Sequence, residues 1–147
     1  MATSALFSVA ILRALNRKGT KKKDLLTIGD INALLPRNNT ERVWGLALSL
    51  NAGLSEELFF RLLLPILLFI VFGNAMLALV LSCVIFGFVH IYQGWLGIIF
   101  TGLLGAGLMY IYLITGCIWI AMLVHASIDI NGLIIQPFMQ RNLFKSK

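Results

Sequence analysis

Six ionisable side chains stand inside strongly apolar segments of this chain, where hydrocarbon would normally exclude them. They are two adjacent glutamates, one arginine, both histidines and one aspartate: Glu56, Glu57, Arg61, His90, His125 and Asp129. On insertion scales each costs about 2.5–3.5 kcal/mol at the centre of a bilayer, so such residues mark a functional site by default. A carboxylate can take a proton from water, and an imidazole can donate a hydrogen bond to a developing negative charge. These are two requirements of hydrolysis.

The first cluster divides into a pair and a free acid. Glu57 and Arg61 stand four residues apart with the acid first, which is the favourable order for an ion pair within one helix. Glu56 points about 100° away around the same helix and has no such partner. We therefore expect Glu57 and Arg61 to support the helix and Glu56 to be free for chemistry.

Two further pairs have the same four-residue spacing, Phe86 with His90 and His125 with Asp129. The members of each pair share one helix face. Asp129 can thus orient His125 or contact a substrate, whereas we expect Phe86 to pack. A lone histidine in a membrane helix more often forms an interhelical hydrogen bond than a site. The convergence of the whole set is what favours a functional site.

The composition predicts a membrane protein. Hydrophobic residues make up 59% of the 147 residues, charged residues only 12%, and the mean hydropathy is +0.91. A soluble domain would be about half apolar and about a quarter charged.

The net charge of +6 is concentrated at the two ends, with six lysines and arginines in the first 23 residues and three in the last seven. Basic residues that flank apolar spans follow the positive-inside rule, so we expect both termini to be cytoplasmic. The charge does not cover a folded face. We therefore expect the lipid bilayer as a partner and no nucleic acid.

From Val43 to Met139 the chain is apolar almost without a break, which predicts an all-α, polytopic transmembrane helix bundle. Turns at Gly73-Asn74, Tyr92-Gln93-Gly94 and Gly116 divide it into about four spanning helices, at 57–73, 75–91, 95–115 and 117–136. Helices of these lengths suit a hydrocarbon core about 30 Å thick.

Three positions are expected to interrupt the helices. Pro65 predicts a kink in the first helix, and Pro137 predicts the end of the last. Residues 43–55 are too few to cross a bilayer alone. Joined to the first helix they would exceed its thickness, so we expect a re-entrant or kinked segment broken near Gly53.

We divide the chain into three parts: a basic interfacial or cytoplasmic segment at 1–41, an intramembrane core at 42–137 and a basic tail at 138–147. Within the first part, residues 2–12 are expected to form an interfacial helix, or else the end of a truncated span. With a rise of about 1.5 Å per residue, Glu56, His90 and Asp129 fall within about 7 Å of one another in depth. They lie in the half of the bilayer nearer the basic ends, and His125 lies one or two turns deeper.

The motifs resemble those of the CPBP family of intramembrane proteases. Glu56-Glu57-x-x-x-Arg61, Phe86-x-x-x-His90 and His125-x-x-x-Asp129 match its three motifs in order, each in an apolar helix, over about residues 40–135. The family includes type II CAAX prenyl endopeptidases and bacterial relatives linked to bacteriocin processing and immunity. Leu62 stands where the family commonly has glycine, and members usually carry additional N-terminal spans. The chain thus resembles the catalytic core alone, with 42–137 as a protease core.

The resemblance implies a membrane endopeptidase acting on a membrane-associated peptide or protein, such as a prenylated CAAX substrate. Glu56 would activate the attacking water, Glu57 and Arg61 would hold that helix in place, and His90, His125 and Asp129 would complete the site.

Two mechanisms stay open. The histidines would stabilise the oxyanion without a metal, or Glu56, His90 and His125 would bind a divalent cation such as Zn²⁺. The chain has no HExxH motif, the usual local zinc signature, and we favour the metal-independent mechanism. Two other functions are consistent with the residues: a non-catalytic immunity or binding protein that keeps the protease fold, and an ion or proton carrier.

Overall fold

The computed structural model describes residue 31 and residues 34–139. The predicted interfacial helix at 2–12, the basic N-terminal run and all but the start of the C-terminal tail lie outside these residues. Within them the chain forms helices and no strand. They are α2 (Asn39–Glu57), the π-helical η1 (Leu58–Leu63), α3 (Leu64–Phe72), α4 (Ala75–Val89), the 3₁₀ turn η2 (Ile91–Gln93), α5 (Gly94–Thr115), α6 (Ile118–Ile130) and the π-helical η3 (Asn131–Ile135).

The first helical rod is longer than expected, because α2, η1 and α3 follow one another without a break from Asn39 to Phe72. Asn38 caps its start by accepting a 2.8 Å hydrogen bond from the backbone N–H of Glu41, as a good N-cap residue does. The expected re-entrant segment and the break near Gly53 were therefore wrong. A Cβ at Gly53 would lie 2.8 Å from the carbonyl oxygen of Met122 and 2.9 Å from Cβ of Ala126. This glycine lets α2 approach α6 closely; it does not end a helix.

Pro65 and Pro137 lie within helices, and each follows a π-helical segment. Segment η1 ends two residues before Pro65 and η3 ends two residues before Pro137. The expected kink at Pro65 thus takes the form of a π-helical segment. The expected end before Pro137 was wrong, since the helix runs on to Met139. A π-helical register is one of the local adjustments that let membrane helices carry proline.

The turns lie where the sequence predicted them. Gly73 and Gly116 close α3 and α5 in the left-handed conformation, with φ of 66° and 63°, which glycine adopts without a steric cost. Gly94 follows η2 with φ of 76°. As a result α4 and α5 begin and end within two residues of their predicted bounds.

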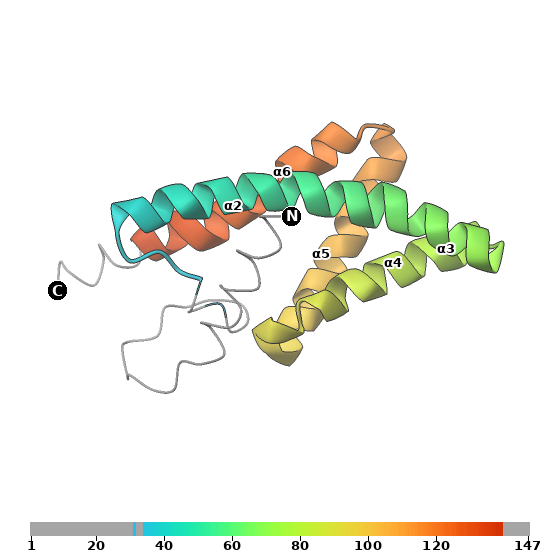
Figure 1. Cartoon of the computed structure of the whole chain (residues 1–147), viewed down its shortest axis with the longest axis horizontal. Helices are drawn as coiled ribbons and strands as arrows, with labels where there is room; N and C mark the ends of the chain where they lie inside the picture. Colours follow the sequence, from blue (N-terminus) through green and yellow to red (C-terminus); the bar gives the residue numbers. More distant parts are fainter. Residues whose placement is uncertain (1–30, 32–33, 140–147) are drawn as a thin grey trace.

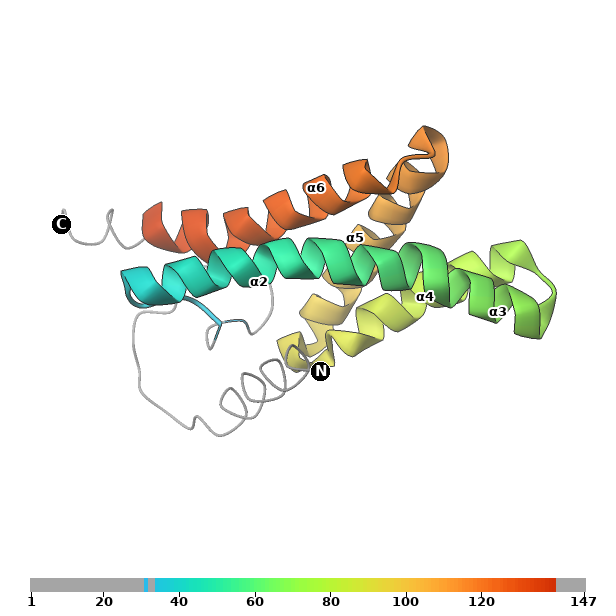
Figure 2. The same cartoon turned by 45° about the horizontal axis from the view of Figure 1, so that its top comes forward.

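Figures 1 and 2 show how the helices are arranged. The long rod α2–η1–α3 packs along α6 through its first half and along α4 through its second half (Figure 1). Helix α5 packs on α4 and crosses toward the start of α6. The contact between α4 and α5 is close, since a Cβ at Gly87 would lie 3.1 Å from Cα of Gly102. The polar residues of the three motifs thus come from helices that meet near the middle of the rod.

The distribution of side chains is that of a membrane protein. Large apolar residues such as Ile70, Val71 and Trp95 are more than 70% exposed, whereas the buried residues include Glu57, Arg61, Ser82 and His125. Contiguous exposed apolar surface of this kind requires lipid or a partner. Two helices, Ile91–Thr115 and Ile118–Met139, are long and apolar enough to cross a membrane, and Ala75–Val89 is shorter. The fold is the predicted all-α, polytopic transmembrane bundle.

Candidate active site

Glu57 and Arg61 form the predicted ion pair, deep inside the bundle. Arg61 Nε lies 2.9 Å from Glu57 Oε2, and the two residues are 3% and 0% exposed. The guanidinium has two further contacts: Nη2 donates a long, 3.4 Å hydrogen bond to the carbonyl of Gly105, and its carbon lies 4.6 Å from the ring centroid of Phe86. Arg61 is thereby fixed between the rod, α4 and α5.

The second oxygen of Glu57 contacts a histidine from another helix. Glu57 Oε1 lies 2.7 Å from His125 Nδ1, and both side chains are buried. The carboxylate can only accept, so Nδ1 carries the proton. His125 Nε2 then points toward Asp129, whose Oδ2 lies 3.8 Å away. Glu57 therefore orients His125, whereas the sequence had suggested Asp129 for this role. The two residues are 68 positions apart, and no local spacing could reveal the contact.

His90 is oriented by its own helix. It is the C-terminal cap of α4, and its Nδ1 donates to the carbonyl of Phe86 at 2.8 Å. A carbonyl only accepts, so this nitrogen is also the protonated one. The other nitrogen, Nε2, lies 4.0 Å from Oε2 of Glu56. The backbone of α4 thus aims His90 Nε2 at the first glutamate.

Glu56 has no comparable partner. Its side chain is 24% exposed, and its Oε2 is buried without a hydrogen-bond partner in the part of the chain that the structure describes. The 4.0 Å separation from His90 is too long for a direct hydrogen bond, although a bridging water would suit it. A buried, unpaired carboxylate oxygen is costly. Oε2 of Glu57 also lacks a well-formed hydrogen bond, but it lies 2.9 Å from the guanidinium of Arg61, whereas Oε2 of Glu56 has only His90 Nε2, 4.0 Å away.

The ring of Phe86 lies at the centre of these contacts. Its centroid is 4.9 Å from that of His90, 6.0 Å from that of His125 and 5.0 Å from that of Phe60. Phe86 is 1% exposed, and a Cβ at Gly105 would come within 2.6 Å of its Cδ1. The ring packs and is not open to a substrate, as the sequence predicted. It separates and positions the two imidazoles.

All seven motif residues are therefore brought together: Glu56, Glu57 and Arg61 from the rod, Phe86 and His90 from α4, and His125 and Asp129 from α6. The expected separation of His125 from the other residues, one or two helical turns in depth, was too large, because His125 contacts Glu57 directly. Residues outside the motifs also join the cluster, among them the small residues Gly105 and Ser82. Nothing in the local sequence distinguishes them from other small residues in apolar helices.

The side chains that the structure describes do not converge as a metal site. Within the described residues no group of three histidine, cysteine, aspartate or glutamate side chains is placed to hold a metal ion. In the proposed set Glu56, His90 and His125, both Nδ1 atoms donate to protein acceptors, which leaves Nε2 as the possible ligand atom of each histidine. A catalytic zinc centre needs three protein ligands converging on one point. This arrangement does not fit one.

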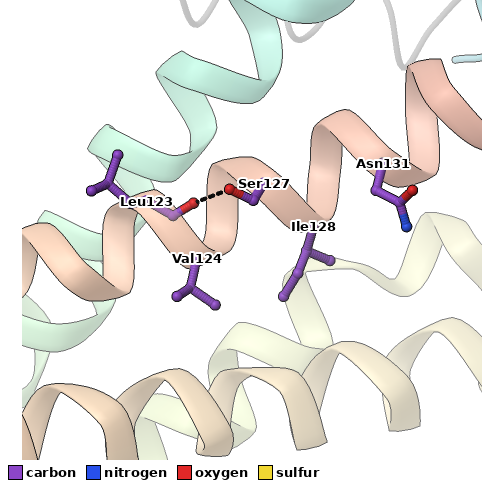
Figure 3. A pocket seen from close by; sticks show the side chains of 5 residues that line it. All are labelled: Leu123, Val124, Ser127, Ile128 and Asn131. Atoms are coloured by element: carbon purple, nitrogen blue, oxygen red, sulfur yellow. Dashed lines mark hydrogen bonds between the residues drawn. The ribbon is translucent and has the colours of Figure 1, made fainter.

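A shallow open pocket of about 350 Å³ lies beside the site, along α6 (Figure 3). Leu123, Val124, Ser127, Ile128 and Asn131 line it, and the hydroxyl of Ser127 donates to the carbonyl of Leu123 in its own helix. None of these residues belongs to the motifs. The pocket is an apolar surface depression and holds no chemistry of its own.

The family of the chain follows from a comparison with family models. Residues 38–131 match the model described as type II CAAX prenyl endopeptidase Rce1-like. This match covers more than half of the chain, and the chain belongs to that family, as the motif resemblance predicted. No curated protein and no solved structure matches it. The protein is thus an integral membrane protein of a CAAX-type intramembrane protease family.

Proposed function

We propose that the protein is an endopeptidase that hydrolyses a peptide bond of a membrane-associated substrate, with Glu56 as the residue that activates water. The observation that carries the proposal is the contrast between the two glutamates. Glu57 lies 2.7 Å from His125 through Oε1 and 2.9 Å from the guanidinium of Arg61 through Oε2, whereas the buried Oε2 of Glu56 faces only His90 Nε2, at 4.0 Å. A general base must keep a lone pair free for the proton it removes.

The hydrogen bonds limit what the two histidines can do. In its neutral form each histidine has one N–H, at Nδ1, and donates it to a protein acceptor. Neither then has an N–H left for an oxyanion, and a donor at Nε2 requires the imidazolium. An imidazolium at His125 would have a carboxylate at each nitrogen, Glu57 and Asp129. We assign the oxyanion donor to His125 in that form, and His90 to holding the water beside Glu56.

The described residues then supply every protein group that the proposed reaction needs. Glu56 takes a proton from water, the resulting hydroxide attacks the scissile carbonyl, and the negative charge forms toward His125. Glu56 returns the proton to the leaving amine, as a general base does when it becomes a general acid. Glu57, itself paired with Arg61, holds the His125 imidazolium in one orientation and stabilises its charge, in the way that an orienting carboxylate acts in a catalytic triad.

Cleavage of CAAX-type peptides, prenylated and unprenylated, by the purified protein in detergent or liposomes tests the proposal. Glu56→Gln keeps the shape of the side chain and removes the base, and we expect cleavage to fall at least about a hundredfold. Glu41→Gln is the control, since Glu41 is exposed at the start of α2. Full cleavage by Glu56→Gln would remove this residue from the mechanism. Wild-type function retained by Glu56→Gln in an immunity assay would indicate a binding role instead.

We also propose that residues 42–137 form the protease core and that both termini face the cytoplasm. The basic flanks support this orientation, since positive residues favour the cytoplasmic side. The test is labelling of single cysteines placed at positions 2 and 146 in a variant that lacks Cys83 and Cys117. We expect an impermeant thiol reagent to label neither position in intact cells and both positions after lysis. Labelling in intact cells would reverse the orientation.

A further inference from the structure

Ser82 forms a buried hydrogen bond between two helices that belongs to none of the three motifs. Its side chain is 0% exposed, and its hydroxyl donates to the backbone carbonyl of Phe60 at 2.6 Å. Ser82 is on α4, whereas Phe60 is in the π-helical segment η1 of the rod. Most buried serines in membrane helices bond to a carbonyl of their own helix, as Ser49 does with Gly45 here. The hydrogen bond of Ser82 therefore joins two helical segments, unlike that of Ser49.

The carbonyl of Phe60 needs a donor because of Pro65. In the π-helical register each N–H bonds to the carbonyl five residues earlier, and the N–H of Leu64 bonds to Phe59 in this way. The next N–H in the series would bond to Phe60, but position 65 is proline and has none. A buried carbonyl without a donor destabilises the folded state. The hydroxyl of Ser82 takes the place of the missing N–H.

The same turn of helix carries the support of the active site. Arg61 directly follows Phe60, and its guanidinium pairs with Glu57, which in turn holds His125 Nδ1. The ring of Phe60 packs edge-on against the ring of Phe86, 5.0 Å between centroids. A change in the register of η1 would therefore move Arg61 and release Glu57. The position of His125 depends on this register through two direct contacts.

We propose that Ser82 is a positioning residue of the protease. It acts through the Phe60 carbonyl to hold the π-helical register, and hence Arg61, Glu57 and His125, in the productive arrangement. The proposal rests on the proposed function for its kinetic consequence. The coupling between Ser82 and Pro65 follows from the backbone alone and can be measured without a substrate.

The experiment compares five variants in the full chain: Ser82→Ala, Ser82→Thr, Pro65→Ala, the double variant Ser82→Ala/Pro65→Ala, and Ser49→Ala. Pro65→Ala restores a backbone N–H at the position that faces Phe60. Ser82→Thr keeps the hydroxyl. Ser49→Ala is the matched control, because Ser49 is also 0% exposed but bonds within its own helix. The readouts are kcat and KM for peptide cleavage, the unfolding temperature in detergent, and the ¹⁵N resonances of the His125 ring.

We expect Ser82→Ala to lower kcat at least about tenfold with KM nearly unchanged, which is the effect of losing one hydrogen bond of ordinary strength in the transition state. Ser82→Thr and Ser49→Ala should stay within about threefold of wild type, the range of changes smaller than one hydrogen bond. In the Pro65→Ala background the Ser82→Ala change should cost less than about twofold, since coupled sites are not additive. An equal cost in both backgrounds would overturn the proposal, as would equal kcat losses for Ser82→Ala and Ser49→Ala.

If the wild-type protein cleaves none of the peptides, the proposed function fails but the positioning role is still tested. Ser82→Ala should lower the unfolding temperature and shift the His125 ring resonances, whereas Ser49→Ala should leave those resonances in place. In the Pro65→Ala background, Ser82→Ala should no longer change the unfolding temperature or the His125 resonances. Unchanged His125 resonances in a folded Ser82→Ala variant would overturn the role.

Discussion

The adjacent glutamates should respond in opposite ways to the same substitution. Glu57→Gln removes a charge that faces Arg61 at 2.9 Å and His125 at 2.7 Å, in a place that is 0% exposed. Arg61 would remain buried with the carbonyl of Gly105 and the ring of Phe86 as its other contacts. Leaving one member of a buried ion pair uncompensated costs about 3–5 kcal/mol. Glu56→Gln removes a charge that has no direct partner, and the loss of an uncompensated buried charge does not destabilise the fold.

For a chain of this size, 3–5 kcal/mol corresponds to a decrease of order 10 °C in the unfolding temperature. We therefore expect Glu57→Gln to unfold about 10 °C below wild type in detergent, and Glu56→Gln to unfold at or above the wild-type temperature. Tryptophan fluorescence or differential scanning fluorimetry of the purified variants gives both values. Peptide cleavage should fall in both, but only Glu56→Gln should lose it while fully folded.

Two results would refute the reasoning. Equal unfolding temperatures for the two variants would mean that Glu57 is not the counter-ion of a buried Arg61. A large decrease for Glu56→Gln would mean that Glu56 has a structural partner, and it could not then be the free base. The double change Glu57→Gln/Arg61→Met is the control. It removes both charges, so no uncompensated charge stays buried, and we expect it to unfold above Glu57→Gln.

Three further predictions concern packing and metal. Gly105→Ala places a Cβ 2.6 Å from the ring of Phe86 and should lower both stability, by about 1–3 kcal/mol, and activity; Gly107→Ala has nothing within 4 Å and should change neither. Gly53→Ala places a Cβ 2.8 Å from the backbone of Met122 and should separate α2 from α6, with loss of activity, whereas Gly45→Ala meets only ordinary contacts beyond 3.7 Å and should be active. A chelator such as EDTA or 1,10-phenanthroline should leave peptide cleavage within about twofold, because no metal takes part in the proposed steps. Unfolding temperatures and cleavage rates check the first two, and a loss of cleavage restored by added Zn²⁺ would contradict the third.

Much of this fold could be predicted from the sequence because its signals are local. Gly73, Gly116 and the Tyr92–Gly94 turn were recognisable as helix ends, and the motif acids and histidines were recognisable because they are costly in apolar segments. The errors also have local causes. A glycine such as Gly53 is compatible both with close packing against α6 and with a helix break, and the sequence alone does not distinguish these two roles.

The contacts that the sequence could not predict all join distant segments. Glu57 reaches His125, Arg61 reaches Gly105, and Ser82 supplies the donor that Pro65 lacks. Spacing along one helix says which side chains share a face, but not which helix lies opposite. Proline likewise predicts a disturbed helix. It does not predict that a hydroxyl from another helix repairs it.

The length of the rod from Asn39 to Phe72 has a consequence for how water reaches the site. Its 19, 6 and 9 residues extend about 50 Å at 1.5 Å per residue, whereas the hydrocarbon core is about 30 Å thick. With the Gly73 turn at one surface of the bilayer, the rod emerges from the other surface about one helical turn before Glu56. In the proposed reaction, water then has to descend only about 5 Å below the headgroups to meet the carboxylate. A substrate need expose its scissile bond no deeper than that, and can keep its apolar end in the lipid.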